Sequence, residues 1–137
     1  MEPIALLVDD ERALRAYVSM VLQRGGFQVL EAGDGLDALT LLRGVRGAVN
    51  VLITDVKMPR MSGIELVEVV KTDFPDIPVV YVSAEGLRDR LDNPLGHITF
   101  LQKPFGPQAI LEAVRSVTAP EAGQAVPLPP NGFSQGM

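Results

Sequence analysis

The chain has 137 residues, no cysteine and a formal net charge of -5. This length suits one domain with its own hydrophobic core, and the absence of cysteine excludes disulfides, thiolate metal sites and cysteine nucleophiles. The acidic balance argues against direct binding to nucleic acid or to an anionic membrane, and no apolar run approaches the roughly 18 residues of a membrane span. The N-terminus reaches Asp9-Asp10-Glu11 without a basic leader, so we expect no secretory signal and a cytoplasmic location.

Five short apolar runs alternate with segments in which apolar residues recur at helical spacing. The runs are typical of buried parallel strands and cover residues 4–8, 29–32, 51–54, 79–82 and 98–102. A first helix of about 13 residues is predicted to end at Gly25-Gly26, because the apolar residues from Leu14 to Val21 share one face. The alternation of strands and helices predicts an α/β fold.

Turn and capping residues mark the later helices. Residues 33–35 are predicted to form a turn before a short helix whose apolar face consists of Leu36, Leu39 and Leu42. Ser62 and Glu65 have the spacing of a capping box at the start of a third helix, which two prolines end before the fourth strand. Pro107 suits the first turn of a last helix.

Two stretches depart from this pattern. Residues 86–97 have little apolar face and include Pro94, so we expect one or two helical turns at residues 87–91 followed by a loop. The fourth helix should therefore be short or irregular. From residue 119 onward the chain is rich in proline and glycine and nearly uncharged. We predict a domain over residues 1–118 and a disordered tail or linker over residues 119–137.

Polar residues that suit one chemical site follow four of the predicted strands. Asp9 and Asp10 follow the first, Asp55 the third, Ser83 the fourth and Lys103 the fifth. Ligands bind at the carboxyl ends of the strands in open α/β sheets, so these side chains should lie together. The three carboxylates suit a hard cation such as Mg²⁺. Phosphoryl transfer would use Asp55 as nucleophile, Lys103 as cation and Ser83 as hydroxyl donor.

Four segments carry a resemblance to a known family: VDDE at residues 8–11, TDVKMPRMSGIEL at 54–66, YVSA at 81–84 and FLQKPF at 100–105. In this order at strand ends, they make the chain similar to the receiver domain of two-component response regulators. The chain resembles both the chemotaxis regulators and the receivers of hybrid sensor kinases. The resemblance implies a flavodoxin-like, doubly wound sheet of five parallel strands in the order 2-1-3-4-5.

The resemblance also implies roles for the acidic residues and the lysine. Asp55 would be the phosphoacceptor, Mg²⁺ would be held by Asp9, Asp10 and Asp55, and Lys103 would contact the phosphoryl group. The Lys103–Pro104 bond is expected to be cis. The phosphoryl donor would be a histidine kinase or a histidine phosphotransfer protein. The receiver would act on a downstream protein target or on a covalently linked output domain, and it would assist its own phosphorylation and dephosphorylation without being an enzyme in the usual sense.

Four further positions are implied to serve the switch and the mouth of the site. Ser83 would be the switch hydroxyl and Phe100 the switch aromatic. Lys57 and Glu85 lie two residues after the phosphoacceptor and the switch hydroxyl. An ion pair between them would cover the path of the water that hydrolyses the acyl phosphate. An exposed ion pair contributes only about 0–1 kcal/mol, so both side chains being solvated is the alternative.

Each site residue also has a simpler explanation. Asp10 alone suits a cap of the first helix, and Asp55 alone suits a turn residue. Ser83 suits a helix cap, Lys103 a solvated surface charge and Phe100 a core aromatic.

Two other functions fit part of the pattern. A phosphatase of the haloacid dehalogenase type also uses an aspartate, a lysine and Mg²⁺, but it needs an Asp-x-Asp motif that this chain lacks. A degenerate receiver that binds proteins without being phosphorylated is the second alternative. His97 has no metal-binding partners at suitable spacing and is expected to be an exposed loop residue.

Overall fold

The computed structural model describes residues 2–84 and 98–118, and its framework is a five-stranded parallel sheet. The strands are β1 (Ile4–Val8), β2 (Gln28–Ala32), β3 (Val51–Asp55), β4 (Val79–Ser83) and β5 (Ile98–Gln102). Their order across the sheet is β2-β1-β3-β4-β5, and every neighbouring pair is parallel. This confirms the predicted flavodoxin-like order and brings the carboxyl ends of all five strands to one edge of the sheet.

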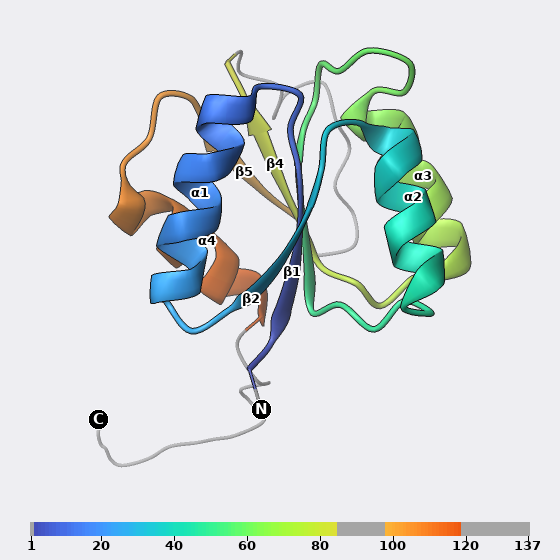
Figure 1. The fold of residues 1–137 in the computed structure, drawn as a ribbon, viewed down its shortest axis with the longest axis horizontal. Helices are drawn as coiled ribbons and strands as arrows, with labels where there is room; N and C mark the ends of the chain where they lie inside the picture. Colours follow the sequence, from blue (N-terminus) through green and yellow to red (C-terminus); the bar gives the residue numbers. More distant parts are fainter. Residues whose placement is uncertain (1, 85–97, 119–137) are drawn as a thin grey trace.

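The helices of the described residues cover both faces of the sheet (Figure 1). They are α1 (Arg12–Arg24), α2 (Gly35–Gly44), α3 (Gly63–Asp73) and α4 (Pro107–Thr118). Helices α1 and α4 pack on one face, and α2 and α3 pack on the other. Along β1, Ala5 and Leu7 face the first pair of helices while Leu6 and Val8 face the second. Burial on both faces explains why the central strands read as continuous apolar runs.

Local side-chain bonds fix where the helices begin. At α3 the Glu65 N–H donates to the Ser62 hydroxyl at 3.1 Å, and the Ser62 N–H donates to the Glu65 carboxylate at 2.9 Å, which confirms the capping box. At α2 the Asp34 carboxylate accepts from the Asp37 N–H at 2.9 Å. The N-cap of α1 is Glu11 with no side-chain cap bond. The alternative in which Asp10 caps this helix is therefore wrong.

The predicted apolar face of α2 needs one correction. Leu39 and Leu42 are buried, but Leu36 is 42% exposed. The buried face centres on Gly35, Ala38, Leu39 and Leu42. With 3.6 residues per turn, Leu36 lies roughly 100° around the helix from that centre and therefore faces solvent.

The expected turns at residues 87–91, the irregular fourth helix and the tail at 119–137 lie outside the described residues. The strands β3 and β4 run one residue further than predicted and end on Asp55 and Ser83 themselves. Among the described residues, none of the helices has the length and apolar character needed to cross a membrane.

Candidate functional site

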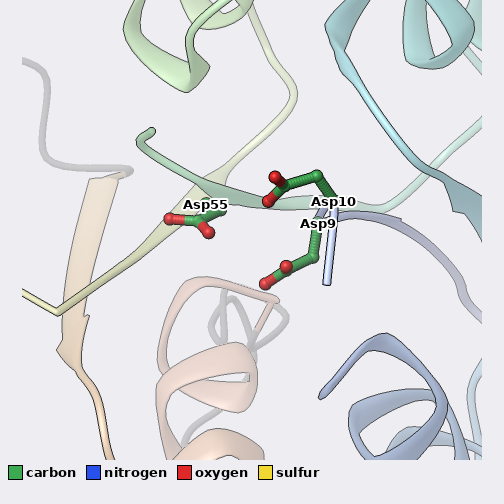
Figure 2. A group of neighbouring side chains, drawn as sticks. All are labelled: Asp9, Asp10 and Asp55. Carbon is green, nitrogen blue, oxygen red and sulfur yellow. The ribbon is translucent and has the colours of Figure 1, made fainter. Parts of the chain in front are cut away.

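Three carboxylates meet at the carboxyl edge of the central strands (Figure 2). Asp9 and Asp10 follow β1, and Asp55 is the last residue of β3. The two strands are neighbours, with Val8 opposite Thr54, so their ends place the three side chains beside one another. One oxygen from each carboxylate lies within 4.8 Å of the others. The predicted acidic cluster is therefore present in the structure.

Lys103 brings a positive charge to this cluster. Its Nζ donates to Asp55 Oδ2 at 3.0 Å and lies 3.5 Å from Asp9 Oδ2. The Lys103 N–H donates to the Ser83 carbonyl at 2.8 Å, and the bond from Lys103 to Pro104 is cis as predicted. Burial by itself lowers the pKa of Lys103, but the bonds and charges of Asp55 and Asp9 outweigh it and leave the pKa above its usual value. Lys103 is thus a charged part of the site and not a solvated surface lysine.

Asp9 is held firmly by its surroundings. Its N–H donates to the Ala32 carbonyl at 3.1 Å, and its own carbonyl accepts from Arg15 Nη1 at 2.7 Å. Its Oδ1 accepts from the Glu11 N–H at 2.8 Å. The backbone and the side chain of this buried aspartate are therefore both fixed. Arg15 was not among the predicted site residues, because a helical arginine five positions after the acidic pair reads as an ordinary surface residue.

Burial, and then the neighbouring carboxylates, disfavour the charged form of Asp9. Burial is the largest cause that raises the pKa of Asp9 above its usual value, and the charges of Asp55 and Asp10 raise it further. The Glu11 N–H and Lys103 lower it but do not cancel the rise. A divalent cation bound by the cluster would remove this penalty, because it favours the charged form of each ligand.

The buried Asp55 is placed by contacts of both its carboxylate and its backbone. Its Oδ1 accepts from the Val56 N–H at 2.7 Å, and its carbonyl accepts from the buried Thr54 hydroxyl at 2.8 Å. A Cβ at position 63 would lie 2.0 Å from the Asp55 carbonyl oxygen, so only glycine fits there. Gly63 was not predicted as a site residue; a glycine at the first position of a helix was the available signal.

Ser83 and Phe100 lie on the neighbouring strands β4 and β5. Ser83 is buried at the end of β4, opposite Gln102 of β5. The half-buried Phe100 ring stacks on Tyr81, with ring centroids 5.6 Å apart and planes at 19°. Burial first, and then the charge of Glu68, raises the pKa of Tyr81 to about 12. The Phe100 ring therefore covers a tyrosine that stays neutral.

The mouth of the site is described only in part. Lys57 follows Asp55 by two residues and is exposed. Glu85 and His97 lie outside the described residues.

The donor set fits a hard divalent cation. All three ligands are carboxylates, and Asp10 is exposed while the other two are buried. Oxygen donors with one side open to solvent suit Mg²⁺, which keeps several waters when it binds proteins. The predicted ligands Asp9, Asp10 and Asp55 therefore have the chemistry and the proximity that Mg²⁺ requires.

Comparison with known protein families agrees with this geometry. The family model of the response regulator receiver domain matches residues 5–115. The response regulator protein FleR of Pseudomonas aeruginosa is 37% identical over 111 residues, which cover 80% of this chain and 23% of FleR. A chemotaxis protein CheY homolog of Campylobacter jejuni is 36% identical over 124 residues, which cover 87% of this chain and 95% of that protein. The chain thus spans nearly all of the second relative but less than a quarter of the first.

Solved structures with the same fold include regulators and one kinase receiver. Chemotaxis protein CheY4 of Vibrio cholerae matches with a TM-score of 0.77 and 31% identity, covering 85% of this chain and 99% of CheY4. The receiver domain of the hybrid histidine kinase CckA matches with a TM-score of 0.71 and 30% identity, covering 83% of this chain and 98% of the CckA domain. TrrA of Thermotoga maritima, solved in complex with Mg²⁺-BeF, matches with a TM-score of 0.72 and 25% identity, covering 84% of this chain and 98% of TrrA. The chain belongs to the response regulator receiver domain family and is a receiver domain of two-component signalling.

Proposed function

We propose that Asp55 accepts a phosphoryl group from a histidine kinase or a histidine phosphotransfer protein, and that its phosphorylation switches a protein-interaction surface. The observation that carries this proposal is the position of Asp55 among charged groups. Its carboxylate bonds to Lys103 at 3.0 Å and has two further carboxylates within 4.8 Å. A nucleophile beside a cation and a set of metal ligands is what phosphoryl transfer needs from a protein.

The residues of the site have different roles in the proposed phosphoryl transfer. An Asp55 oxygen forms a bond to phosphorus while the bond from phosphorus to the donor's histidine nitrogen breaks, and that nitrogen keeps the electron pair. Lys103 and Ser83 would contact the phosphoryl oxygens. Asp9, Asp10 and Asp55 would hold Mg²⁺, as the Mg²⁺-BeF complex of the similar TrrA supports. Bound Mg²⁺ supplies positive charge to the phosphoryl oxygens.

The two alternative functions receive less support. The match to the receiver domain family argues against a phosphatase of the haloacid dehalogenase type. A degenerate receiver would be expected to lack part of the acidic cluster or the lysine, whereas both are present. We therefore regard the chain as a phosphoacceptor that assists its own phosphorylation and dephosphorylation, and not as a classical enzyme.

The context of the receiver is a further part of the proposal. FleR and the full-length sensor kinase CckA of Brucella abortus, of which the match covers 12%, extend far beyond the matched region, whereas the CheY homolog does not. Both a covalently linked output domain and a separate protein target are compatible with these relatives. We place the signalling in the cytoplasm, and we propose that the receiver acts through protein partners without direct contact to nucleic acid or membrane.

The first prediction tests the phosphoacceptor. Asp55→Asn should abolish phosphorylation by acetyl phosphate and Mg²⁺ while the fold remains intact, because the amide oxygen still accepts from the Val56 N–H. Intact-protein mass spectrometry should show one added phosphoryl group on the wild type and none on the variant. Asp76→Asn, an exposed carboxylate remote from the cluster, is the control and should behave as wild type. Phosphorylation of Asp55→Asn at the wild-type rate would overturn the assignment.

The second prediction concerns the pH dependence of stability without metal. The pKa of Asp9 is raised in the folded state, so the unfolded chain releases its proton first as the pH increases. Asp9 therefore lowers the free energy of unfolding of the wild type as the pH rises from about 4, and the loss is complete once the pH exceeds the raised pKa of Asp9 in the folded state. Asp9→Asn should then have the higher free energy of unfolding at pH 7 in EDTA, and this gain should vanish near pH 4.

Urea unfolding at several pH values provides the measurement. Mg²⁺ should stabilise the wild type more than the Asp9→Asn variant, because a ligand that binds only the folded state stabilises it. A variant that is less stable than wild type at pH 7 without Mg²⁺ contradicts the predicted cost of this buried charge.

The third prediction concerns the switch. A phosphoryl group adds roughly two negative charges, and Ser83 and Lys103 can follow it only by shifting the strand ends that carry them. Phe100 precedes Lys103 by three residues and stacks on Tyr81. We expect beryllofluoride with Mg²⁺ to move the Phe100 ring and so change the environment of Tyr81.

The two tyrosines of the chain allow a test with an internal control. After incorporation of fluorotyrosine, the ¹⁹F signal of Tyr81 should shift on adding beryllofluoride and Mg²⁺. Tyr17 belongs to α1, on the other face of the sheet from Tyr81, and the position of its signal should not change. The absence of any change at Tyr81 would exclude Phe100 as a switch residue.

The fourth prediction concerns the lifetime of the phosphorylated state. We propose that Lys57 and Glu85 pair across the mouth of the site and shield the acyl phosphate from water. Lys57→Ala and Glu85→Ala should each speed the loss of phosphate from Asp55. The double variant should be little faster than either, because breaking one partner already opens the path. Equal dephosphorylation rates in the wild type and both single variants would show that no such lid exists.

A further inference from the structure

A side-chain contact ties the loop after β3 to the turn before α2. Arg60 Nη2 donates to Asp34 Oδ2, across 26 residues of sequence. The other oxygen of Asp34 accepts from the Asp37 N–H at 2.9 Å, and Asp37 Oδ1 lies 4.0 Å from the same Arg60 nitrogen. A single buried aspartate therefore both caps α2 and holds the loop that follows Asp55.

The backbone of this loop is strained at the same residue. Arg60 has a φ of 69°, in the left-handed region that side chains other than glycine rarely adopt. Such a conformation persists only where the surrounding contacts hold it, and it is found most often at functional sites. Two contacts can hold Arg60 in place: the ion pair with Asp34, and the bond across Arg60 in which the Met61 N–H donates to the Pro59 carbonyl at 2.7 Å.

Close packing continues from this pair to Asp55. A Cβ at Gly35 would lie 2.8 Å from Met61 Sδ, so the loop rests directly against the start of α2. At the other end of the loop, the Gly63 N–H donates to the Val56 carbonyl at 2.8 Å, and Gly63 lies against the Asp55 carbonyl. A displacement of the loop is therefore transmitted to the backbone that carries the phosphoacceptor.

We propose that Asp34 and Arg60 form a positioning pair for phosphoryl transfer, which holds the β3–α3 loop so that Asp55 points correctly at the incoming group. Neither residue belongs to the acidic cluster, so the pair acts through Asp55 and the adjacent Val56 N–H. The inference rests on the proposed function of Asp55 and adds two residues to it. The Asp37 N–H, and then Arg60, hold the pKa of Asp34 below its usual range, so the pair is charged at neutral pH.

Two substitutions break the pair and leave the N-cap of α2 in place, although Arg60→Gly also removes the longer 4.0 Å contact with Asp37. Asp34→Asn keeps an oxygen for the Asp37 N–H but loses the charge that Arg60 needs. Arg60→Gly removes the side chain and suits the left-handed φ. Arg43→Gln is the matched control, because it removes the 3.9 Å ion pair with Asp73 that links the opposite ends of the same two helices.

The readout is the rate of phosphorylation at saturating acetyl phosphate and Mg²⁺, together with the final stoichiometry and the melting temperature. Asp34→Asn and Arg60→Gly should lower the rate constant by about 3-fold to about 100-fold, the range expected for a misplaced nucleophile, while full stoichiometry is still reached. The double variant should be no slower than the slower single variant. Arg60→Lys should recover part of the rate, and Arg43→Gln should match the wild type.

Arg60→Gly distinguishes positioning from a merely structural role. Its melting temperature should stay close to wild type, because relief of the left-handed φ offsets the greater freedom of glycine in the unfolded chain. A purely structural contact would lower the melting temperature or the phosphorylated fraction and leave the rate constant of the folded protein unchanged. Rate constants for Asp34→Asn and Arg60→Gly equal to that of Arg43→Gln would overturn the proposal.

A second measurement separates this inference from the proposed function. If the wild type accepts no phosphoryl group, the proposed function fails, and amide hydrogen exchange then tests the positioning pair by itself. Exchange at Val56 and Gly63 should be faster in Asp34→Asn than in Arg43→Gln. Equal exchange in the two variants would show that the pair does not hold the loop.

Discussion

One ammonium group between two buried carboxylates is the interaction on which the site depends. Lys103 Nζ lies 3.0 Å from Asp55 and 3.5 Å from Asp9, and it is the positive charge that these two acids share. Without it, two buried carboxylates would repel each other in partly desolvated surroundings. Any negative charge added to Asp55 competes with Asp9 for this lysine. Because the Lys103 N–H also bonds to the Ser83 carbonyl at the end of β4, the proposed phosphorylation of Asp55 would act on β4 and β5 together.

The acidic cluster combines a fixed ligand with an adjustable one. Asp9 is held by the Ala32 carbonyl, by Arg15 and by the Glu11 N–H. Asp10 next to it is exposed. A fixed carboxylate keeps the cost of organising the site low, because it loses no freedom when the cation arrives. A solvated neighbour could move onto or off the cation, and this combination suits the proposed Mg²⁺ site.

The strand ends and caps were predictable because they depend on local patterns. Buried parallel strands read as apolar runs, so the positions of Asp55 and Lys103 at strand ends follow from their neighbours in sequence. The contact between Asp34 and Arg60 was not predictable, since it depends on how α2 and α3 pack across 26 residues. The stack of Tyr81 on Phe100 likewise requires the register of β4 against β5, which no local pattern encodes.

The sheet order explains how one site can be both rigid and responsive. The central strands β1 and β3 carry the acidic cluster, with β2 on one side and β4 and β5 on the other. On the β2 side, Arg15 links the Asp9 carbonyl to Glu31 at 3.2 Å, and Arg60 links the β3–α3 loop to Asp34. These bonds stiffen one flank of the site. The other flank is joined to the site by the pairing of β3 with β4 and by the Lys103 side chain. In the proposed switch, the strain of a new charge on Asp55 would be released toward β5, where the proposed switch aromatic lies.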